Sequence, residues 1–395
     1  MSILLSQRVQ QIKPSATLAV SAKAAELRAA GRDVIGLGTG EPDFDTPEHI
    51  KEAAIEALKR GDTKYTAVDG TAALKSAIIE KFQRDNQLEY TAANILVSSG
   101  AKQTLYNLCQ ALLGDADEAI IPAPYWVSYP AMVKLAGAEP VLIKAPASQN
   151  FKITPAQLEA AITPKTRLLF LNSPSNPTGV AYSREEFAAL GQVLDDYPHV
   201  IIASDEIYEH IYWGKAPFCS FATACPHLID RIVVVNGASK VFAMTGWRLG
   251  YGAGPVDLIA PMKKIQSQST SNPCSLSQAA AVAALNGPMT SVHQMVKAFK
   301  ERHDYLIPAL NAVDGIQCLS CDGAFYAFPD FSQLVARAGV RDDVQLAERI
   351  LEQVDLALVP GTAFGAPGFI RISYAAGMET LTTAVQRLED FVAAI

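Results

Sequence analysis

Six short apolar runs, each ending in a loop of small and polar residues, alternate along this chain with stretches of helical periodicity. The runs lie at 95–97, 118–121, 140–143, 167–171, 200–203 and 232–235. Such alternation is typical of an α/β protein with a mainly parallel sheet of buried strands. In such sheets ligands bind beyond the carboxyl ends of the strands, so the loops after these runs are the first candidates for a functional site.

Two amphipathic stretches predict helices on either side of a change in pattern near residue 285. The stretch 46–60 opens on Thr46 and Pro47, which are typical of a helix cap and a first helical residue. The stretch 292–311 has Glu301, Arg302 and Asp304 among its expected exposed positions.

Shorter elements follow the second amphipathic stretch. Apolar runs at 325–328, 357–359 and 369–373 predict short strands, and a terminal helix is expected from Glu379. We interpret this part as a second, smaller α+β domain, with a boundary near the Asn-Gly-Pro at 286–288. The pattern alone does not place the first 45 residues.

Composition excludes several classes of function. With 395 residues, two or three domains of about 150 residues each are expected. The net charge of −7 argues against nucleic-acid binding and against binding to an anionic membrane. The longest charge-free stretch, 265–296, is broken by polar residues, Pro and Gly, whereas a membrane span needs about 20 apolar residues. The first 16 residues contain no signal-peptide core, so a cytoplasmic location is predicted.

Cysteine and histidine give little indication of metal or redox chemistry. The six cysteines are too scattered for a disulfide framework. Cys318 and Cys321 form a CxxC, which we interpret as two thiols flanking a turn because no redox-type strand–helix context accompanies it. The six histidines have no metal-ligand spacing, so no metal is expected.

Polar groups concentrate in four loops at strand ends. The segment 98–103 opens a helix with small residues, which suits a phosphate, although many ordinary strand-to-helix turns contain Gly and Ser. The Asn-Pro-Thr-Gly turn within 172–179 is rich in donors, or is simply a tight loop capped by its own Asn side chains. Asp205 and Glu206 are open to interpretation as a metal site, an acid/base pair or a helix cap. Lys240 follows a strand, and Arg248 lies eight residues further on.

In combination, these loops resemble those of the fold-type I pyridoxal-phosphate enzymes, specifically the class I aminotransferases. The likeness covers nearly the whole chain. It extends to segments similar to the bacterial aspartate aminotransferase subgroup: Ser-Ala-Thr at 15–17, Gly-Glu-Pro-Asp-Phe-Asp-Thr-Pro at 40–47, Lys-Tyr at 64–65, Pro-Tyr-Trp-Val-Ser-Tyr at 124–129, Met-Thr-Gly-Trp-Arg at 244–248 and Arg-Ile-Ser-Tyr at 371–374.

The resemblance implies a three-layer α/β fold whose central sheet binds pyridoxal 5′-phosphate. It also implies a large domain over 46–284 and a small domain formed by 1–45 and 285–395. Lys240 would attach the cofactor covalently and then move the substrate's proton, and Asp205 would hold a proton on the pyridine nitrogen. Tyr208 and Asn176 would donate hydrogen bonds to the phenolic oxygen, and Trp126 would stack on the ring.

The phosphate would lie near Ala101, Lys102 and Arg248, and Tyr65 would reach it from a second subunit of a homodimer. The phosphate-binding serine that many relatives carry three residues before the lysine is replaced here by Gly237. Ser239 lies beside the lysine, and the resemblance does not establish that it substitutes for that serine.

For the substrate, the resemblance implies that Arg371 binds the α-carboxylate with help from Gly40 and Asn176. Read without the family, Arg371 is an ordinary surface arginine at a strand end. Lys102 is the candidate partner of a second carboxylate, the alternative being that it only adds positive charge near the phosphate. Ser15 and Thr17 would add neutral hydrogen bonds.

The implied reaction is ping-pong transfer of an amino group from aspartate to 2-oxoglutarate, giving oxaloacetate and glutamate. Aromatic amino acids or prephenate are alternative substrates. A carbon–sulfur β-lyase or a γ-eliminase on the same fold would share the site residues and differ in releasing sulfide or ammonia. A cofactor-sensing regulator would need a DNA-binding module, and the residues before Thr46 are too few and not basic enough for one.

Overall fold

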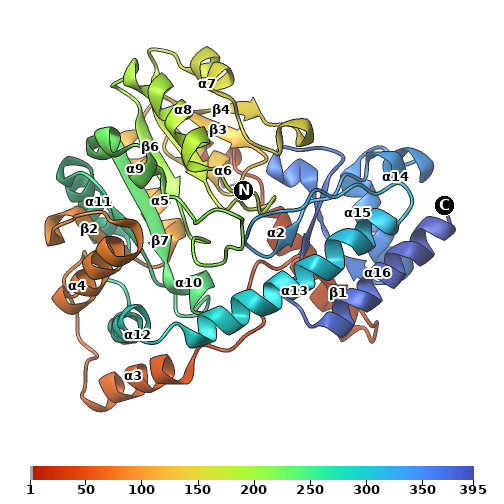
Figure 1. Cartoon of the computed structure of the whole chain (residues 1–395), viewed down its shortest axis with the longest axis horizontal. Helices are drawn as coiled ribbons and strands as arrows, with labels where there is room; N and C mark the ends of the chain where they lie inside the picture. The colour runs from red at the N-terminus through yellow and green to blue at the C-terminus, as the bar shows by residue number, and fades with distance from the viewer. Residues whose placement is uncertain (1–2) are drawn as a thin grey trace.

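A seven-stranded sheet forms the centre of the computed structural model, which describes residues 3–395 (Figure 1). The strand order is β2-β8-β7-β6-β5-β3-β4, and all pairs are parallel except the two that involve β8. The strands are β2 (Ile95–Ser98), β3 (Glu118–Ala123), β4 (Glu139–Lys144), β5 (Thr166–Asn172), β6 (Ile201–Asp205), β7 (Ile232–Gly237) and β8 (Gly250–Ala253). The six apolar runs therefore correspond to strands of a mainly parallel sheet.

Two details of the sheet differ from the prediction. β8 was not predicted, because its sequence Gly-Tyr-Gly-Ala lacks the β-branched residues that mark strands. β4 was expected to be buried, but it is one of the two edge strands, and of its six residues only Ile143 is buried. An edge strand pairs on one side alone, so Leu142 remains 47% exposed.

Helices cover both faces of the sheet, which gives three layers. Alternate residues of β5 point to opposite sides: Leu169 and Leu171 enter one core, and Leu168 and Phe170 enter the other. The first core is closed by α3 (Glu48–Lys59), α4 (Ala72–Lys81), α7 (Pro155–Ala161), α8 (Arg184–Asp195), α9 (Phe221–Ala224) and α12 (Ser275–Asn286). The second is closed by α5 (Ala101–Leu112), α6 (Tyr129–Leu135) and α11 (Val256–Ser269).

Helix α3 begins later than predicted. Pro47, rather than Thr46, is its N-cap residue. The Thr46 hydroxyl donates to the Ala243 carbonyl at 2.7 Å and accepts from the Trp247 indole at 2.9 Å. The side chain expected to cap the helix therefore fastens it to the loop after Lys240.

A separate core cluster lies among the C-terminal elements. The small sheets there are β11-β12-β9 and the parallel pair β1-β10, which joins the N-terminal segment to the C-terminal part. The elements are β1 (Ile35–Gly36), β9 (Tyr326–Ala327), β10 (Leu356–Ala357), β11 (Val359–Pro360), β12 (Ile370–Ser373), α1 (Gln7–Gln10), α2 (Ala16–Ala29), α13 (Thr290–Ala312), α14 (Ser332–Arg337), α15 (Asp343–Val354) and α16 (Met378–Ala393). These pairings favour the division into domains at 46–284 and at 1–45 with 285–395, which stays a prediction.

Helix α13 is the longest helix described (Figure 1). It contributes Val292 to the first core of the large sheet and Phe299 to the separate C-terminal core cluster. Its Arg302 was expected to be exposed but is buried. The guanidinium forms a two-pronged ion pair with Asp43 at 2.7 and 2.8 Å. Helical periodicity marks the apolar positions of a helix face, and it cannot identify a charged residue that finds a partner 259 positions away.

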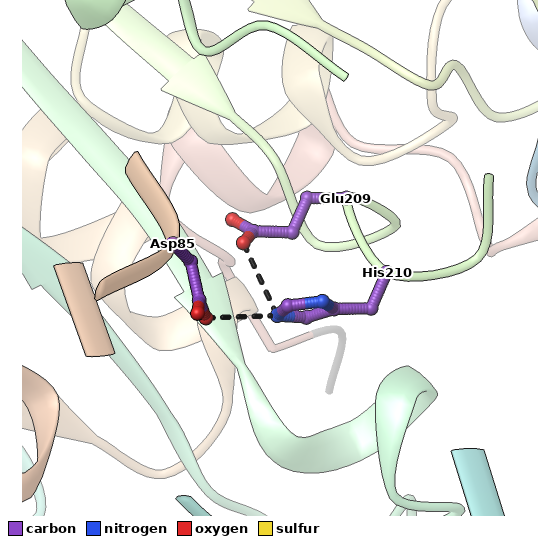
Figure 2. A group of neighbouring side chains, drawn as sticks. All are labelled: Asp85, Glu209 and His210. Atoms are coloured by element: carbon purple, nitrogen blue, oxygen red, sulfur yellow. Dashed lines mark ion pairs between the residues drawn. The ribbon is translucent and has the colours of Figure 1, made fainter. Parts of the chain in front are cut away.

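A buried ion-pair network lies behind the turn that follows β6 (Figure 2). Glu209 and Asp85 both contact the imidazole of His210, at 3.2 and 3.4 Å. The Lys81 ammonium lies 2.5 Å from a Glu209 carboxylate oxygen, and the other oxygen accepts from Asn236 at 2.6 Å. Asp85, Glu209 and His210 are the one group in residues 3–395 with the spacing of metal ligands. The Lys81 ammonium already supplies a positive charge to this group.

Replacing Lys81 by methionine should destabilise the fold by about 3–5 kcal/mol, because Glu209 would remain buried without its cation. Urea unfolding of the purified protein measures this loss. Lys23→Met is the matched control, since the Lys23–Glu26 pair is solvent-exposed and should contribute less than about 1 kcal/mol. Equal effects of the two substitutions would contradict a stabilising role for the Lys81 network.

All six cysteines are free thiols, and burial raises the pKa of both Cys318 and Cys321 to about 12. The Cys321 thiol packs against the Tyr374 hydroxyl at 3.5 Å. Both thiols of the CxxC are thus buried, and the segment between them forms no turn. Among residues 3–395, no helix combines the length and the apolar character needed to cross a bilayer.

Candidate active site

A cavity of about 320 Å³ opens at the carboxyl ends of β5, β6 and β7. Adjacent strands bring their last residues level: Asn172 of β5 pairs with Asp205 of β6, which pairs with Val235 of β7. The predicted site residues that line it are Ser15, Thr17, Gly40, Ala101, Lys102, Trp126, Asn176, Asp205, Tyr208, Lys240, Arg248 and Arg371. The structure thus gathers residues that are up to 356 positions apart in the sequence (371 − 15 = 356).

Lys240 lies on α10 (Ala238–Val241), the single helical turn that begins directly after β7. Its ammonium donates a hydrogen bond of 2.6 Å to the Gly40 carbonyl. Burial lowers the pKa of Lys240 to about 8, and the positive charges of Arg371, Arg248 and Lys102 lower it further, while Glu41 opposes the shift. An amine with such a pKa is partly neutral near pH 7 to 8, as a nucleophile or proton carrier must be.

Asp205 ends β6 and projects into the cavity. One carboxylate oxygen accepts from the Tyr129 hydroxyl at 2.7 Å, and the other from the Ile207 amide at 3.3 Å. Burial raises its pKa to about 6, and the hydrogen bond from Tyr129 opposes that rise. No helix follows, since 207–210 form a turn, so the interpretation of Asp205 as a helix cap is wrong.

Glu206 points away from Asp205 to a different set of partners. It accepts from the hydroxyls of Ser204 and Ser220, both at 2.7 Å, and from the Phe221 amide at 3.2 Å. Burial raises the pKa of Glu206 to about 7, and the nearby Glu209 adds to the rise. The two adjacent carboxylates therefore do not form a pair, and only Asp205 lines the cavity.

Arg371 lies on β12, the central strand of the three-stranded sheet, and only 2% of its surface is exposed. The interpretation as a surface arginine is wrong, because strands β9 and β11 flank it. Its guanidinium donates to the Asn176 side chain at 2.9 Å and to the Gly38 carbonyl. Its Nε is buried without a hydrogen-bond partner among the described residues.

Tyr326 contacts both Arg371 and Tyr208. Its hydroxyl lies 2.8 Å from the Tyr208 hydroxyl, and its ring lies 4.6 Å below the Arg371 guanidinium. The hydroxyl would be 2.3 Å from a Cβ on Gly40, so only glycine fits there. Sequence reasoning missed Tyr326, because in the apolar run 325–328 it is indistinguishable from a core residue.

The Asn-rich loop 172–179 connects the two ends of the cavity. The Asn172 side chain donates to the Asp205 backbone carbonyl at 2.9 Å and accepts from the Asn176 backbone N–H at 2.8 Å. The Asn176 side chain then accepts from Arg371. The Asn side chains therefore do cap the backbone of the loop, and its role as a donor to a ligand stays a prediction.

A positive region surrounds the start of α5. Gly100 caps this helix with φ of +94°, and a Cβ on Gly250 would lie 2.1 Å from the Ala101 nitrogen, so the backbones meet closely here. The Arg248 guanidinium is 3.5 Å from the Ser99 carbonyl. The Lys102 ammonium lies 5.0 Å from the Trp126 ring. Cations beside the first turn of a helix suit an anion such as a phosphate.

Of the remaining residues that the sequence singled out, some line the cavity and others do not. Ser15 and Thr17 reach the cavity from the start of α2. Tyr65 is 91% exposed and does not line it. Ser239 does line it, and a Cβ on Gly237 would be 2.9 Å from the Gly250 Cα, so backbone packing excludes a side chain at that position.

A three-layer α/β fold with a desolvated lysine, a buried carboxylate and a buried arginine around one cavity agrees with the fold-type I enzymes that the sequence resembles. Residues 32–388 match the family model described as aminotransferase class I and II. The chain belongs to this family and is an aminotransferase.

Relatives match over the full length. The aspartate/prephenate aminotransferase of Nitrosomonas europaea is 54% identical over 98% of this chain and 99% of its own, and the aspartate aminotransferase of Geobacillus stearothermophilus is 50% identical over 99% of both chains. The crystal structure of the Rhizobium meliloti aspartate aminotransferase superposes with a TM-score of 0.96 at 46% identity, covering 99% of both chains. The Thermus thermophilus aspartate aminotransferase with maleate gives 0.93 at 43%, covering 98% of this chain and 100% of its own.

Proposed function

We propose that this aminotransferase uses pyridoxal 5′-phosphate and transfers the amino group of aspartate to 2-oxoglutarate in a ping-pong reaction. The observation that carries the proposal is that the buried Arg371 and the exposed Lys102 both line the cavity, beside Lys240 and Arg248, since two cations suit a substrate with two carboxylates. Charged groups of a substrate must be met by opposite charges when they leave water.

The donor set fits the cofactor. Asp205 is a buried carboxylate whose partners are a hydroxyl and an amide, and its raised pKa indicates that a cationic N–H, such as a protonated pyridine nitrogen, would be a better one. Ala101, Lys102 and Arg248 line the cavity near the start of α5, where a phosphate would bind. When bound, pyridoxal phosphate supplies an electron sink for the carbanion left by loss of the substrate's α-proton.

Each of these residues would have a separate role in the reaction. Lys240, partly neutral because it is desolvated, would take the proton from the substrate Cα. Tyr208 and Asn176 would hold the phenolic oxygen of the cofactor, and Trp126 would cover its ring. Arg371 would bind the α-carboxylate through its guanidinium, and the Gly40 backbone would assist.

We also propose a homodimer, in which the exposed Tyr65 reaches the phosphate of the other subunit. A cytoplasmic location remains a prediction of the sequence.

Substrate choice is tested by Lys102→Ser. If Lys102 pairs with the distal carboxylate, kcat/KM for aspartate and glutamate should fall about 10- to 1,000-fold, on a loss of roughly 1.5–4 kcal/mol. Alanine and aromatic amino acids should be almost unaffected, since they have no second carboxylate. Steady-state kinetics with all four substrates measure the difference.

An equal loss on every substrate, together with weaker cofactor retention, would assign Lys102 to the phosphate instead. Lys134→Ser is the matched control, because this lysine lies at the end of α6, outside the cavity.

The function as a whole is tested by half-reaction spectra of the purified holoenzyme with a panel of amino acids. Aspartate and glutamate should convert the pyridoxal form to the pyridoxamine form, and 2-oxoglutarate should reverse the change. Release of ammonia or sulfide without need of an oxo acid would instead identify an eliminating lyase. Prephenate and phenylpyruvate should be tested beside 2-oxoglutarate as amino acceptors, because the Nitrosomonas europaea relative bears the name aspartate/prephenate aminotransferase.

A further inference from the structure

The segment 37–46 supplies backbone oxygens to Arg371 and Lys240, two of the cations that line the cavity. The Gly38 carbonyl accepts from Arg371, and the Gly40 carbonyl accepts from Lys240 at 2.6 Å. Gly38 and Gly40 lie in a stretch without helix or strand, so no regular hydrogen bonding fixes their position. The position of Gly38 and Gly40 therefore depends on contacts that other residues of the segment make outside the cavity.

Its first and last residues are fixed by hydrogen bonds. Before Gly38, the Leu37 amide donates to the Ala357 carbonyl at 3.0 Å, and the Leu37 carbonyl accepts from the Ser373 amide at 2.8 Å. At the far end, Thr46 is held by Ala243 and Trp247. Between these anchors, three side chains of the segment make contacts: Thr39 with the Ser21 hydroxyl at 3.3 Å, Phe44 with the Phe299 ring, and Asp43 with Arg302. The contact with Arg302 is the ion pair among them.

The environment of Arg302 makes this contact rigid. Its guanidinium lies 5.3 Å from the Phe44 ring and 5.4 Å from the Phe299 ring, and Phe44 and Phe299 pack edge to face at 5.7 Å. Nη1 also donates to the Tyr374 carbonyl at 3.4 Å, three residues after Arg371. A planar guanidinium held on its faces and bound two-pronged at its edge has little freedom to turn.

We infer that Asp43 and Arg302 form a positioning pair that sets the Gly38–Gly40 backbone against Arg371 and thereby determines the affinity for the substrate's α-carboxylate. Neither residue lines the cavity. The pair acts through the segment. Arg302 lies on α13, whose residues pack into the first core of the large sheet and into the C-terminal core cluster. Asp43 transmits the position of that helix to Gly40, three residues earlier. The inference rests on the proposed function for the identity of its ligand.

The test compares Asp43→Asn and Arg302→Met with wild-type holoenzyme. Asp43→Asn keeps the size of the side chain and removes its charge, so the two-pronged bond is lost. We expect KM for amino acids and oxo acids to rise about tenfold or more whatever their side chain, while kcat changes less than about threefold. The affinity for maleate, a dicarboxylate with no amino group to transfer, should fall in parallel in calorimetric titration.

Lys300→Met is the matched control, because Lys300 lies on the same helix in an exposed ion pair with Asp304. It should leave both kinetic constants unchanged. The double variant Asp43→Asn/Arg302→Met should be no worse than the more affected single variant, since both remove one interaction.

An unchanged KM and unchanged maleate affinity in a folded Asp43→Asn variant would overturn the inference, as would a loss confined to kcat. Should Arg302→Met fail to fold, Asp43→Asn decides alone, because the Asp43 side chain is 29% exposed and tolerates water. Absence of transamination in wild type and Lys300→Met would refute the proposed function instead. The comparison of maleate affinities would still stand.

Discussion

Lys240→Ala should abolish transamination, lowering turnover by about 10⁴-fold or more, because the other lysine that lines the cavity, Lys102, is exposed and lies against the Trp126 ring at the start of α5. The cofactor should still bind, since the cations at the start of α5 and the carboxylate of Asp205 remain. Treatment with a hydride donor should fix the cofactor covalently to wild type and leave it removable from the variant. Single-turnover absorbance changes with aspartate measure the rate.

Lys165→Ala provides the control for this substitution, because Lys165 is exposed and lies outside the cavity. Turnover above background in Lys240→Ala, combined with a covalent adduct after hydride treatment, would show that another residue holds the cofactor.

Asp205→Asn should slow proton abstraction by about 10²- to 10⁴-fold while leaving the fold intact. An amide has the size of the carboxylate and accepts from the Tyr129 hydroxyl on its oxygen, but it carries no charge to keep a proton on the pyridine nitrogen. Stopped-flow measurement of the half-reaction isolates this step from substrate binding.

Glu206→Gln is the control that distinguishes a role of Asp205 in proton abstraction from the general effect of neutralising a buried carboxylate. Its carboxylate is as buried as that of Asp205 but contacts Ser204, Ser220 and Phe221 away from the cavity. We expect it to affect stability and leave the rate of proton abstraction near that of wild type. Wild-type rates in Asp205→Asn would remove Asp205 from the mechanism.

The strands of the sheet were predictable because apolar runs report burial directly, and burial is what a central parallel strand requires. β8 was not, since its two glycines are dictated by close neighbours: a Cβ on Gly252 would lie 2.7 Å from a Thr104 methyl. A glycine that is required because a distant residue packs against it is not indicated by any periodic pattern in the sequence around it.

The candidate site was predictable only through the resemblance of several loops together. Asp205, Lys240 and Arg371 taken singly match a cap, a surface lysine and a surface arginine. Long-range partners distinguish them, such as Gly40 for Lys240, 200 positions away. Arg302 was mispredicted and Tyr326 missed for the same reason, because the contacts that define them come from the fold.

The hydrogen-bonded series from the Asp205 carbonyl through Asn172 and Asn176 to Arg371 has a consequence for how this enzyme can be altered. Residues that share one network have non-additive mutational effects. Epistasis should therefore be strong between substitutions near the carboxylate-binding arginine and those near Asp205. Directed evolution toward new substrates should accumulate changes among residues outside this series, such as Leu18 and Val127 on the cavity wall, before it reaches Asn176.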